Sequence, residues 1–240
     1  MKVTGIIPCR MESTRFPGKP LVKIAGIPMI QRVYSQAKKA EKLDDLFVAS
    51  DSEEIIVFCR QNNIPVIKTG QCLSGSDRVY KACERLESNV LVNIQGDEPL
   101  ISPGVINSVI EPFYGNNVVK IVTARKKISD DYEIHDTNIV KVVCDKEGFA
   151  MYFSRCSIPF DKTQGTDYYK HIGIYAYTKS VLKDFVSLEQ GKIEKSESLE
   201  QLRFLENGYK IYTVITGYDS MGVDVPEDIY KVEKLLKAME

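Results

Sequence analysis

The 240-residue chain contains no tryptophan and only two histidines, and no apolar run approaches the roughly 20 residues that a membrane-spanning helix needs. It also lacks an excess of charge of either sign. Lys and Arg total 32 and Asp and Glu total 33, which gives a formal net charge of −1. A near-neutral balance provides no basic surface for general nucleic-acid binding. These absences exclude membrane-spanning and general nucleic-acid-binding classes and favour a globular enzyme.

None of the six cysteines forms a C-x-x-C pair, and the first residues run directly into a strand-like segment without the features of a signal peptide. We therefore expect reduced thiols, a cytoplasmic location and no membrane association. The cysteines are Cys9, Cys59, Cys72, Cys83, Cys144 and Cys156.

The first half of the chain alternates short apolar runs with amphipathic stretches of helical spacing. The predicted strands are 3–8, 46–49, 65–68, 89–94 and 118–123, and the predicted helices between them begin near residues 28, 52, 77 and 102. Such alternation favours parallel strands joined by crossover helices. We expect an open, mostly parallel, Rossmann-like α/β sheet with helices on both faces and a ligand site at the carboxyl ends of its strands.

The second half has a different pattern. Two β-rich runs flank a four-residue turn at 145–148 that ends in glycine, which is typical of a hairpin. Further helices are predicted near 180–188, 198–207 and 226–239, with a strand at 210–215 between the last two. Without a linker or repeat, we expect one domain, 1–240, with an antiparallel β-rich insertion at about 138–178.

The loop after the first strand combines three cations with two hydroxyl side chains. Cations and exposed backbone N–H groups suit a polyphosphate. The spacing is neither a P-loop nor a G-x-G-x-x-G fingerprint, so a solvated basic loop without a ligand stays an alternative on spacing alone. The side chains concerned are Arg10, Ser13, Thr14, Arg15 and Lys19.

Two acidic segments could hold a divalent cation. Asp97 follows the apolar strand 89–94, and Asp224 lies just before the last predicted helix. Mg²⁺ prefers one or two carboxylates together with phosphate oxygens and water. Taken separately, Asp97 could equally be a turn residue and Asp224 a helix cap. Glu227 and Asp228 suit the first turn of the last helix, where negative charge is favourable.

Four motifs together resemble bacterial cytidylyltransferases that activate acidic sugars. They are R-x-x-S-x-R-x-P-G-K-P-L from Arg10, S-G-S-D-R from Ser74, Q-G-D-E-P from Gln95 and G-V-D-V-P-E-D from Gly222. The likeness extends from residue 6 to residue 228, and the whole chain resembles the 3-deoxy-manno-octulosonate (Kdo) cytidylyltransferase family. It implies a fold of the nucleotide-diphospho-sugar transferase type.

The resemblance also implies residue roles. It makes Lys19, Asp97 and Asp224 catalytic, with Asp97 and Asp224 as ligands of a Mg²⁺ cofactor. The implied CTP-binding residues are Arg10, Ser13, Thr14, Arg15, Lys19, Ser74, Gly75, Arg78 and Gln95. Segment 74–78 also fits a plain loop in which Ser76 or Asp77 caps the next helix, and both interpretations can hold together.

Three further segments resemble the family's acceptor side: F-S-R-x-x-I-P from Phe153, H-x-G-I-Y-x-Y from His171 and E-x-L-E-Q-L-R from Glu197. The likeness implies a sugar pocket and a homodimer contact built from the second half. The implied sugar-binding residues are Gln95, Arg155 or a main-chain group near it, His171, Tyr175, Glu200 and Gln201. Core packing in a strand is the alternative for Tyr175.

The expected activity is transfer of CMP from CTP to the anomeric hydroxyl of Kdo, with release of pyrophosphate, for lipopolysaccharide biosynthesis. The sequence departs from the family at Cys72, Phe160 and Thr178, where His, Trp and Arg are common, and at Cys9, where Ala is usual. These departures leave the acceptor open among Kdo, 8-amino Kdo and another acid. A nucleotide-binding regulator without turnover is the alternative from another class, and the missing fingerprint disfavours a dehydrogenase.

Overall fold

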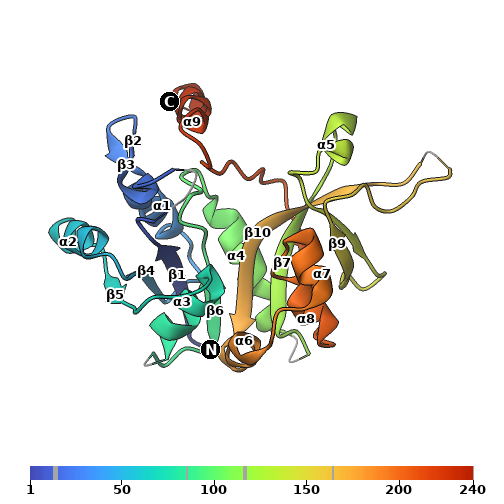
Figure 1. The fold of residues 1–240 in the computed structure, drawn as a ribbon, viewed down its shortest axis with the longest axis horizontal. Helices are drawn as coiled ribbons and strands as arrows, with labels where there is room; N and C mark the ends of the chain where they lie inside the picture. The colour runs from blue at the N-terminus through green and yellow to red at the C-terminus, as the bar shows by residue number, and fades with distance from the viewer. Residues whose placement is uncertain (13–15, 85, 116–117, 164, 240) are drawn as a thin grey trace. The chain divides into compact units, whose positions relative to one another are not determined.

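The computed structural model describes residues 1–12, 16–84, 86–115, 118–163 and 165–239. Ser13, Thr14 and Arg15, which the sequence assigns to the nucleotide, lie outside the described residues. The chain forms two compact units, one of Met1–Asn107 with Ser220–Glu240 and one of Ser108–Asp219 (Figure 1). The prediction of one domain with a β-rich insertion stays a prediction.

A parallel sheet forms the centre of the first unit. Its strands are β1 (Val3–Cys9), β4 (Asp45–Ser50), β5 (Val66–Lys68) and β6 (Val90–Asn93). They lie in the order β6-β1-β4-β5, and every pairing among them is parallel. The side chains of Val3, Ile6 and Ile7 in β1 are fully buried. A central strand covered on both faces reads as a continuous apolar run, which is why the sequence predicts these strands correctly.

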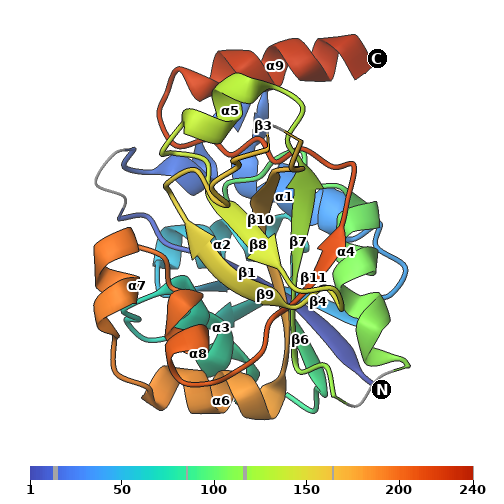
Figure 2. The same cartoon turned by 90° about the vertical axis from the view of Figure 1, so that its right-hand side faces the viewer.

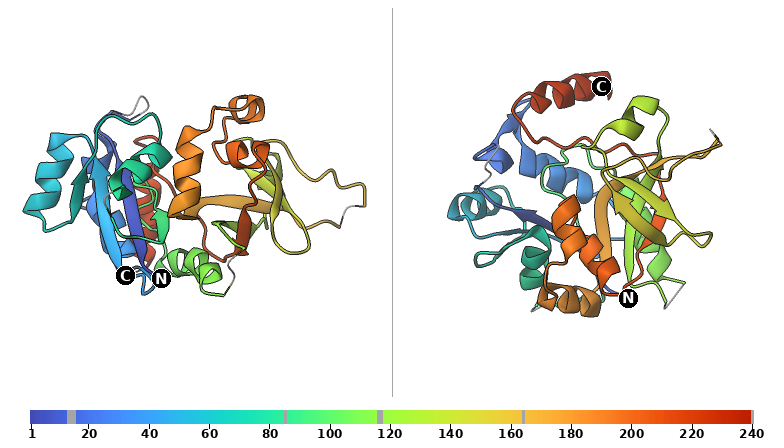
Figure 3. Two further views of the ribbon diagram at one scale, coloured as in Figure 1. Left: turned by 90° about the horizontal axis from the view of Figure 1, so that it is seen from below. Right: turned by 45° about the vertical axis from the view of Figure 1, so that its right-hand side comes forward.

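Helices pack on this sheet, as Figure 3 shows. They are α1 (Met29–Ala37), α2 (Glu53–Gln61) and α3 (Gly75–Cys83). The unit also contains the 3-10 turn η1 (Lys19–Leu21), the small hairpin of β2 (Lys23–Ile24) and β3 (Ile27–Pro28), and α9 (Asp228–Met239), which contacts β2. α3 contacts β1, β4 and β6, and α1 contacts β1 and β4. α4 (Pro103–Ile110) begins directly after Ser102, as its proline predicts.

The cap of α3 differs from the prediction. Ser74, rather than Ser76 or Asp77, is the N-cap, because its hydroxyl accepts the backbone N–H of Asp77. The Asp77 carboxylate accepts the backbone N–H of Ser74 in return, at 2.9 Å. Asp77 therefore serves as the third residue of a capping box, and this exchange fixes the segment that the resemblance assigns to the nucleotide.

Antiparallel pairing dominates the second unit (Figure 2). Its strands are β7 (Ile121–Lys127), β8 (Lys141–Cys144), β9 (Ala150–Ser154), β10 (Tyr169–Thr178) and β11 (Tyr212–Ile215). β10 pairs antiparallel with β7 and β8, and β8 with β9, while β11 pairs parallel with β7. The predicted hairpin is confirmed. The predicted strand 118–123 instead begins at Ile121, because Val118 is exposed.

Short helices complete the second unit: η2 (Glu111–Phe113), α5 (Asp131–His135), α6 (Lys179–Ser187), α7 (Lys192–Glu197) and α8 (Leu202–Glu206). The single helix predicted at 198–207 is wrong at its start. Ser198 has a φ of 52°, a left-handed conformation that ends α7, and α8 begins only at Leu202. The buried Arg203 and Glu194 side chains form a two-bond ion pair, with N–O distances of 2.8 and 2.6 Å, that joins α8 to α7.

None of the six cysteines forms a disulfide, as the sequence predicts. Among the described residues, the helices are too short or too polar for a bilayer span. The combination of a mostly parallel sheet, surrounding helices and a smaller antiparallel part matches the expected α/β class.

Lys141 is a fully buried cation in β8. Its ammonium donates to the carbonyl oxygens of Asp136, Ile139 and Arg155 at 2.8, 2.7 and 2.6 Å. Burial lowers its pKa, and the three carbonyls compensate for the water that the ammonium loses. Lys141 thus ties three loop positions of the second unit to one strand.

Replacing Lys141 by Met should destabilise the protein by about 3 kcal/mol, because three buried carbonyls lose a charged donor at once. Urea unfolding of Lys141→Met measures this change. Lys146→Met, at an exposed position in the turn of the same hairpin, is the matched control and should leave the free energy of unfolding within about 0.5 kcal/mol of wild type. An equally small effect for Lys141→Met would contradict the assignment.

Candidate active site

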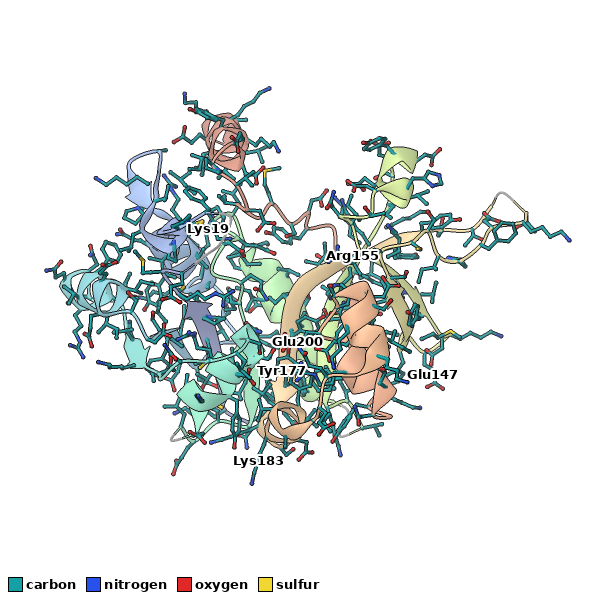
Figure 4. The ribbon with its side chains drawn as sticks, in the orientation of Figure 1. Lys19, Glu147, Arg155, Tyr177, Lys183 and Glu200 are labelled. Carbon is teal, nitrogen blue, oxygen red and sulfur yellow. The ribbon has the colours of Figure 1, made fainter. Side chains whose placement is uncertain are left out.

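The ammonium of Lys19, labelled in Figure 4, lies between two carboxylates. It donates to Asp97 Oδ2 at 2.8 Å and to the carbonyl oxygen of Val223 at 2.8 Å, and it lies 3.6 Å from Asp224 Oδ1. The distance between the two carboxylate oxygens therefore cannot exceed the sum of their distances from the Lys19 nitrogen. Positions 19, 97 and 224 are far apart in sequence, and the fold brings them together at the carboxyl ends of β1 and β6.

Gly96 allows Asp97 to reach this place. A Cβ atom at position 96 would lie 2.9 Å from the carbonyl oxygen of Pro8 and 2.8 Å from Cys9 Sγ. Because the backbone of β1 cannot give way, only glycine fits where β6 passes it. The backbone N–H of Val223 also donates to the carbonyl oxygen of Asp97 at 2.9 Å, so the segment with Asp224 is joined to the end of β6.

Asp228 orients the backbone of Asp224. Its carboxylate accepts the N–H groups of Asp224 and Val225 at 3.0 and 3.2 Å. Burial alone would raise the pKa of Asp228, but hydrogen bonds from Lys231 and these two N–H groups lower it. Asp228 therefore acts at the start of α9, as the sequence predicts, and in addition holds the loop that presents Asp224.

A cavity of about 300 Å³ opens beside these groups in the first unit. Eight residues that the sequence assigns to the site line it: Arg10, Lys19, Ser74, Gly75, Arg78, Gln95, Asp97 and Asp224. Cys72, one of the departures from the family, lines it as well. The loops after β1, β5 and β6 thus contribute to one polar cavity, as expected at the carboxyl end of a parallel sheet.

Arg78 is also engaged in the wall of this cavity. It is only 3% exposed, and its guanidinium donates to Thr69 Oγ1 at 2.7 Å and to Asp51 Oδ2 at 3.0 Å. These bonds tie α3 to the ends of β4 and β5. Nothing local in the sequence indicates that Arg78 has a partner 27 positions away.

The candidate acceptor residues, apart from Gln95, lie in the second unit. His171 Nε2 lies 2.8 Å from Thr123 Oγ1, and the Thr123 hydroxyl donates to the carbonyl oxygen of Ile174 at 2.7 Å. Because the hydroxyl has one proton, His171 Nε2 must be the protonated nitrogen of a neutral ring. Burial lowers the pKa of His171 to about 3, which agrees with a neutral imidazole.

Two aromatic rings flank His171. The ring centroids of Phe153 and Tyr175 lie 5.1 and 5.3 Å from its own. Burial raises the pKa of Tyr175 well above its usual value, with smaller contributions from Tyr177 and Glu200. Tyr175 therefore stays a neutral hydroxyl next to the imidazole.

Two nitrogens of the Arg155 guanidinium, labelled in Figure 4, donate to main-chain oxygens. Its Nε donates to the carbonyl oxygen of Glu197 at 2.8 Å, and one terminal nitrogen donates to that of Thr137 at 3.1 Å. The Glu197 carboxylate in turn accepts the N–H of Arg155 and the hydroxyl of Ser154. Glu200 and the buried Gln201 follow in the loop between α7 and α8.

Comparison with known proteins identifies the family of this chain. A family model described as cytidylyltransferase matches residues 4–211. A relative from Solibacter usitatus, named 3-deoxy-manno-octulosonate cytidylyltransferase, is 45% identical over 99% of this chain and 95% of its own length. The chain belongs to the 3-deoxy-manno-octulosonate cytidylyltransferase family. It is therefore a nucleotidyltransferase, as the motifs predict.

Members of this family share its fold closely. A solved structure named CMP:2-keto-3-deoxy-manno-octonic acid synthetase, complexed with CTP, is 33% identical, covers 100% of both chains and superimposes with a TM-score of 0.96. A relative from Desulfosudis oleivorans with the family's name is 45% identical over the whole chain. The 4-diphosphocytidyl-2C-methyl-D-erythritol synthase of Anaerococcus prevotii, at 12% identity and a TM-score of 0.65, shows the fold alone.

The neutral His171 predicts a pH dependence of stability. Its pKa is about 3 in the folded protein and about 6.5 when exposed, so the unfolded chain takes up a proton first as the pH falls. The contribution of buried, neutral His171 to the free energy of unfolding is therefore full above about pH 6.5 and is lost progressively as the pH falls toward 3. Thermal unfolding between pH 4 and 8 should show a flatter slope for His171→Asn than for wild type. His135→Asn, at an exposed position, should retain the wild-type slope, and the same slope in both variants would contradict the prediction.

Proposed function

We propose that the protein is a 3-deoxy-manno-octulosonate cytidylyltransferase, which couples CTP to Kdo to give CMP-Kdo and pyrophosphate. The observation that supports this most directly is the meeting of Lys19, Asp97 and Asp224 at one polar cavity. The names of relatives at 45% identity and the CTP complex of a member with the same fold support the choice of nucleotide and acceptor.

The donor set fits a hard divalent cation. Asp97 and Asp224 offer carboxylate oxygens only, and the described part of the chain contains no cluster of three or more His, Cys, Asp or Glu residues suited to a metal. Two carboxylates with room for phosphate oxygens and water are what Mg²⁺ prefers, whereas zinc needs more protein ligands. Asp97 and Asp224 would hold Mg²⁺, which, when bound, supplies positive charge to the phosphate oxygens.

Cationic side chains of the protein would also bind the triphosphate. The triphosphate carries several negative charges, and Lys19 and Arg10 at the cavity wall attract it and orient its oxygens. In this proposal, Ser13, Thr14 and Arg15 add contacts to the phosphates. Ser74, Gly75, Arg78 and Gln95 bind the nucleoside, with Arg78 kept in place by Asp51 and Thr69.

The acceptor would be bound by Gln95 and by residues of the second unit. These are Arg155 or the main chain around it, His171, Tyr175, Glu200 and Gln201. In the reaction, the oxygen of the anomeric hydroxyl forms a bond to the α-phosphorus and the bond to pyrophosphate breaks, while the hydroxyl proton is released. Positioning and charge neutralisation then supply most of the rate, as in phosphoryl transfer generally.

The remaining parts of the proposal concern the cell. We propose a cytoplasmic enzyme of lipopolysaccharide biosynthesis that functions as a homodimer through its β-rich part, with no nucleic-acid or membrane partner.

The identity of the nucleotide and of the acceptor is tested with a panel of the four nucleoside triphosphates, each combined with Kdo, 8-amino Kdo and other sugar acids. Turnover of CTP with Kdo above all other pairs is the expected result. CTP binding without turnover of any acid would instead favour a regulator.

Removing either carboxylate should abolish most activity. Asp97→Asn and Asp224→Asn each take one negative charge from the pair, and we expect pyrophosphate release from CTP and Kdo to fall by about 10²-fold or more. Raising Mg²⁺ should restore part of the rate, because weakened metal affinity contributes to the loss.

Glu227→Gln is the matched control, because Glu227 is an exposed carboxylate three positions from Asp224. It should keep the wild-type rate, and all three variants should unfold at similar temperatures. Wild-type activity in Asp97→Asn, or no pyrophosphate release by the wild-type protein with Kdo, would overturn the proposed function.

A further inference from the structure

One face of the β7–β10 pair collects polar side chains. In the antiparallel register, Arg125 lies opposite His171, and Thr123 lies opposite Tyr175. Side chains on alternate positions of a strand share a face, so all four belong to the same side of this ribbon. Residues directly opposite each other are about 5 Å apart, and the two pairs are separated by about 7 Å along β7.

Two polar atoms on this face lack hydrogen-bond partners. Arg125 Nε and the Tyr175 hydroxyl oxygen are buried, and neither has a partner within the described ranges. A buried donor without a partner costs about 1–3 kcal/mol, so folded proteins rarely keep one without a reason. Here two such atoms occur on one face, at adjacent pairs of the same ladder.

Of Arg125 and Tyr175, Arg125 carries the positive charge. Its guanidinium lies over the ring of Tyr169, with Cζ 4.6 Å from the centroid, and it forms no ion pair within the described part of the chain. The neighbouring lysines differ, since Lys126 pairs with Asp219 at 2.7 Å and Lys127 with Asp167 at 2.6 Å. Of these three cations, Arg125 alone has no acidic partner among the residues that the structure describes.

His171 cannot supply that charge. Its ring is neutral, and Nε2–H is used by the Thr123 hydroxyl. The face therefore offers one guanidinium held over an aromatic ring, one buried phenol hydroxyl and a neutral imidazole between aromatic rings. A planar guanidinium stacked on an aromatic ring is pre-organised for a carboxylate, which it can bind through two parallel hydrogen bonds.

We propose that Arg125 binds the carboxylate of the acidic acceptor, on the same strand face as Tyr175, which the proposed function already assigns to the acceptor. This inference rests on the proposed function and adds to it a residue that none of the sequence motifs contains. A sugar acid with a chain of eight carbons has a carboxylate at one end and hydroxyls along its length, so it offers a partner both to a cation and to a hydroxyl on this face.

The assignment has a chemical consequence. In a 2-keto acid sugar, the carboxylate is attached to the anomeric carbon, so it approaches the anionic α-phosphate together with the attacking hydroxyl. Two anions in a site of low dielectric repel each other strongly. Arg125 would neutralise the carboxylate and so lower this repulsion, which makes it a determinant of specificity for acids over neutral sugars.

Steady-state kinetics with Kdo and its C1 amide test the proposal. The amide keeps the shape of the acceptor and removes its charge. The wild-type enzyme should show a KM for the amide about 10- to 100-fold above that for Kdo, because a charge-assisted hydrogen-bond pair is lost. In Arg125→Gln the KM for Kdo should rise by the same factor and the preference for Kdo over the amide should disappear, with KM for CTP unchanged.

Two further variants separate recognition from structure. Arg125→Lys should recover part of the preference for Kdo, because it restores the charge without the bidentate geometry. Lys127→Gln, which removes a neighbouring charge from the same strand, should retain the full preference. A preference for Kdo that persists in Arg125→Gln, or a loss of rate that is equal for both acceptors, would overturn the inference.

The outcomes for the two proposals are distinct. No CMP-Kdo formation by the wild-type enzyme would contradict the proposed function itself. Normal wild-type turnover with an unchanged KM for Kdo in Arg125→Gln would contradict only the role of Arg125. If Arg125→Gln does not fold, Arg125→Lys decides: its preference for Kdo over the amide should be smaller than that of the wild type, and an unaltered preference would contradict the role of Arg125.

Discussion

The site depends on the ammonium of Lys19 between the carboxylates of Asp97 and Asp224. Two carboxylates this close repel each other, and a cation between them removes that cost. The surrounding structure serves the same arrangement. Gly96 lets β6 pass the backbone of β1, and Asp228 holds the N–H groups that orient Asp224. One ammonium between two carboxylates leaves a net negative charge, which a metal ion would neutralise.

The two units contribute different chemistry. The parallel sheet of the first presents cations, carboxylates and loop N–H groups at the carboxyl ends of its strands, which suits a polyphosphate. The antiparallel ribbon of the second presents hydroxyl, imidazole and guanidinium groups on the β7–β10 face, which suits a polyhydroxy acid. Its ion pairs, such as Lys126 with Asp219 and Arg203 with Glu194, keep other charges occupied. Arg125 differs from them because no acidic side chain among the described residues pairs with it.

The sequence predicted the buried strands well, because runs such as 3–8 and 89–94 are apolar throughout and have one stable environment. It placed Lys19, Asp97 and Asp224 through motifs rather than spacing. It could not predict the start of β7, the end of α7 at Ser198 or the cap at Ser74, since these depend on packing and on one backbone angle. Nor could it find the Val223 carbonyl or the orphaned Arg125, because main-chain atoms leave no mark in a sequence and the register of β7 against β10 is a tertiary property.

The most direct test is a crystal structure of the protein grown with CTP and Mn²⁺, in which anomalous scattering locates the metal. The account predicts one metal position bound by carboxylate oxygens of both Asp97 and Asp224 and by phosphate oxygens of CTP, at coordination distances of about 2.1 Å. A metal held by the triphosphate alone, or by Asp97 without Asp224, would contradict it.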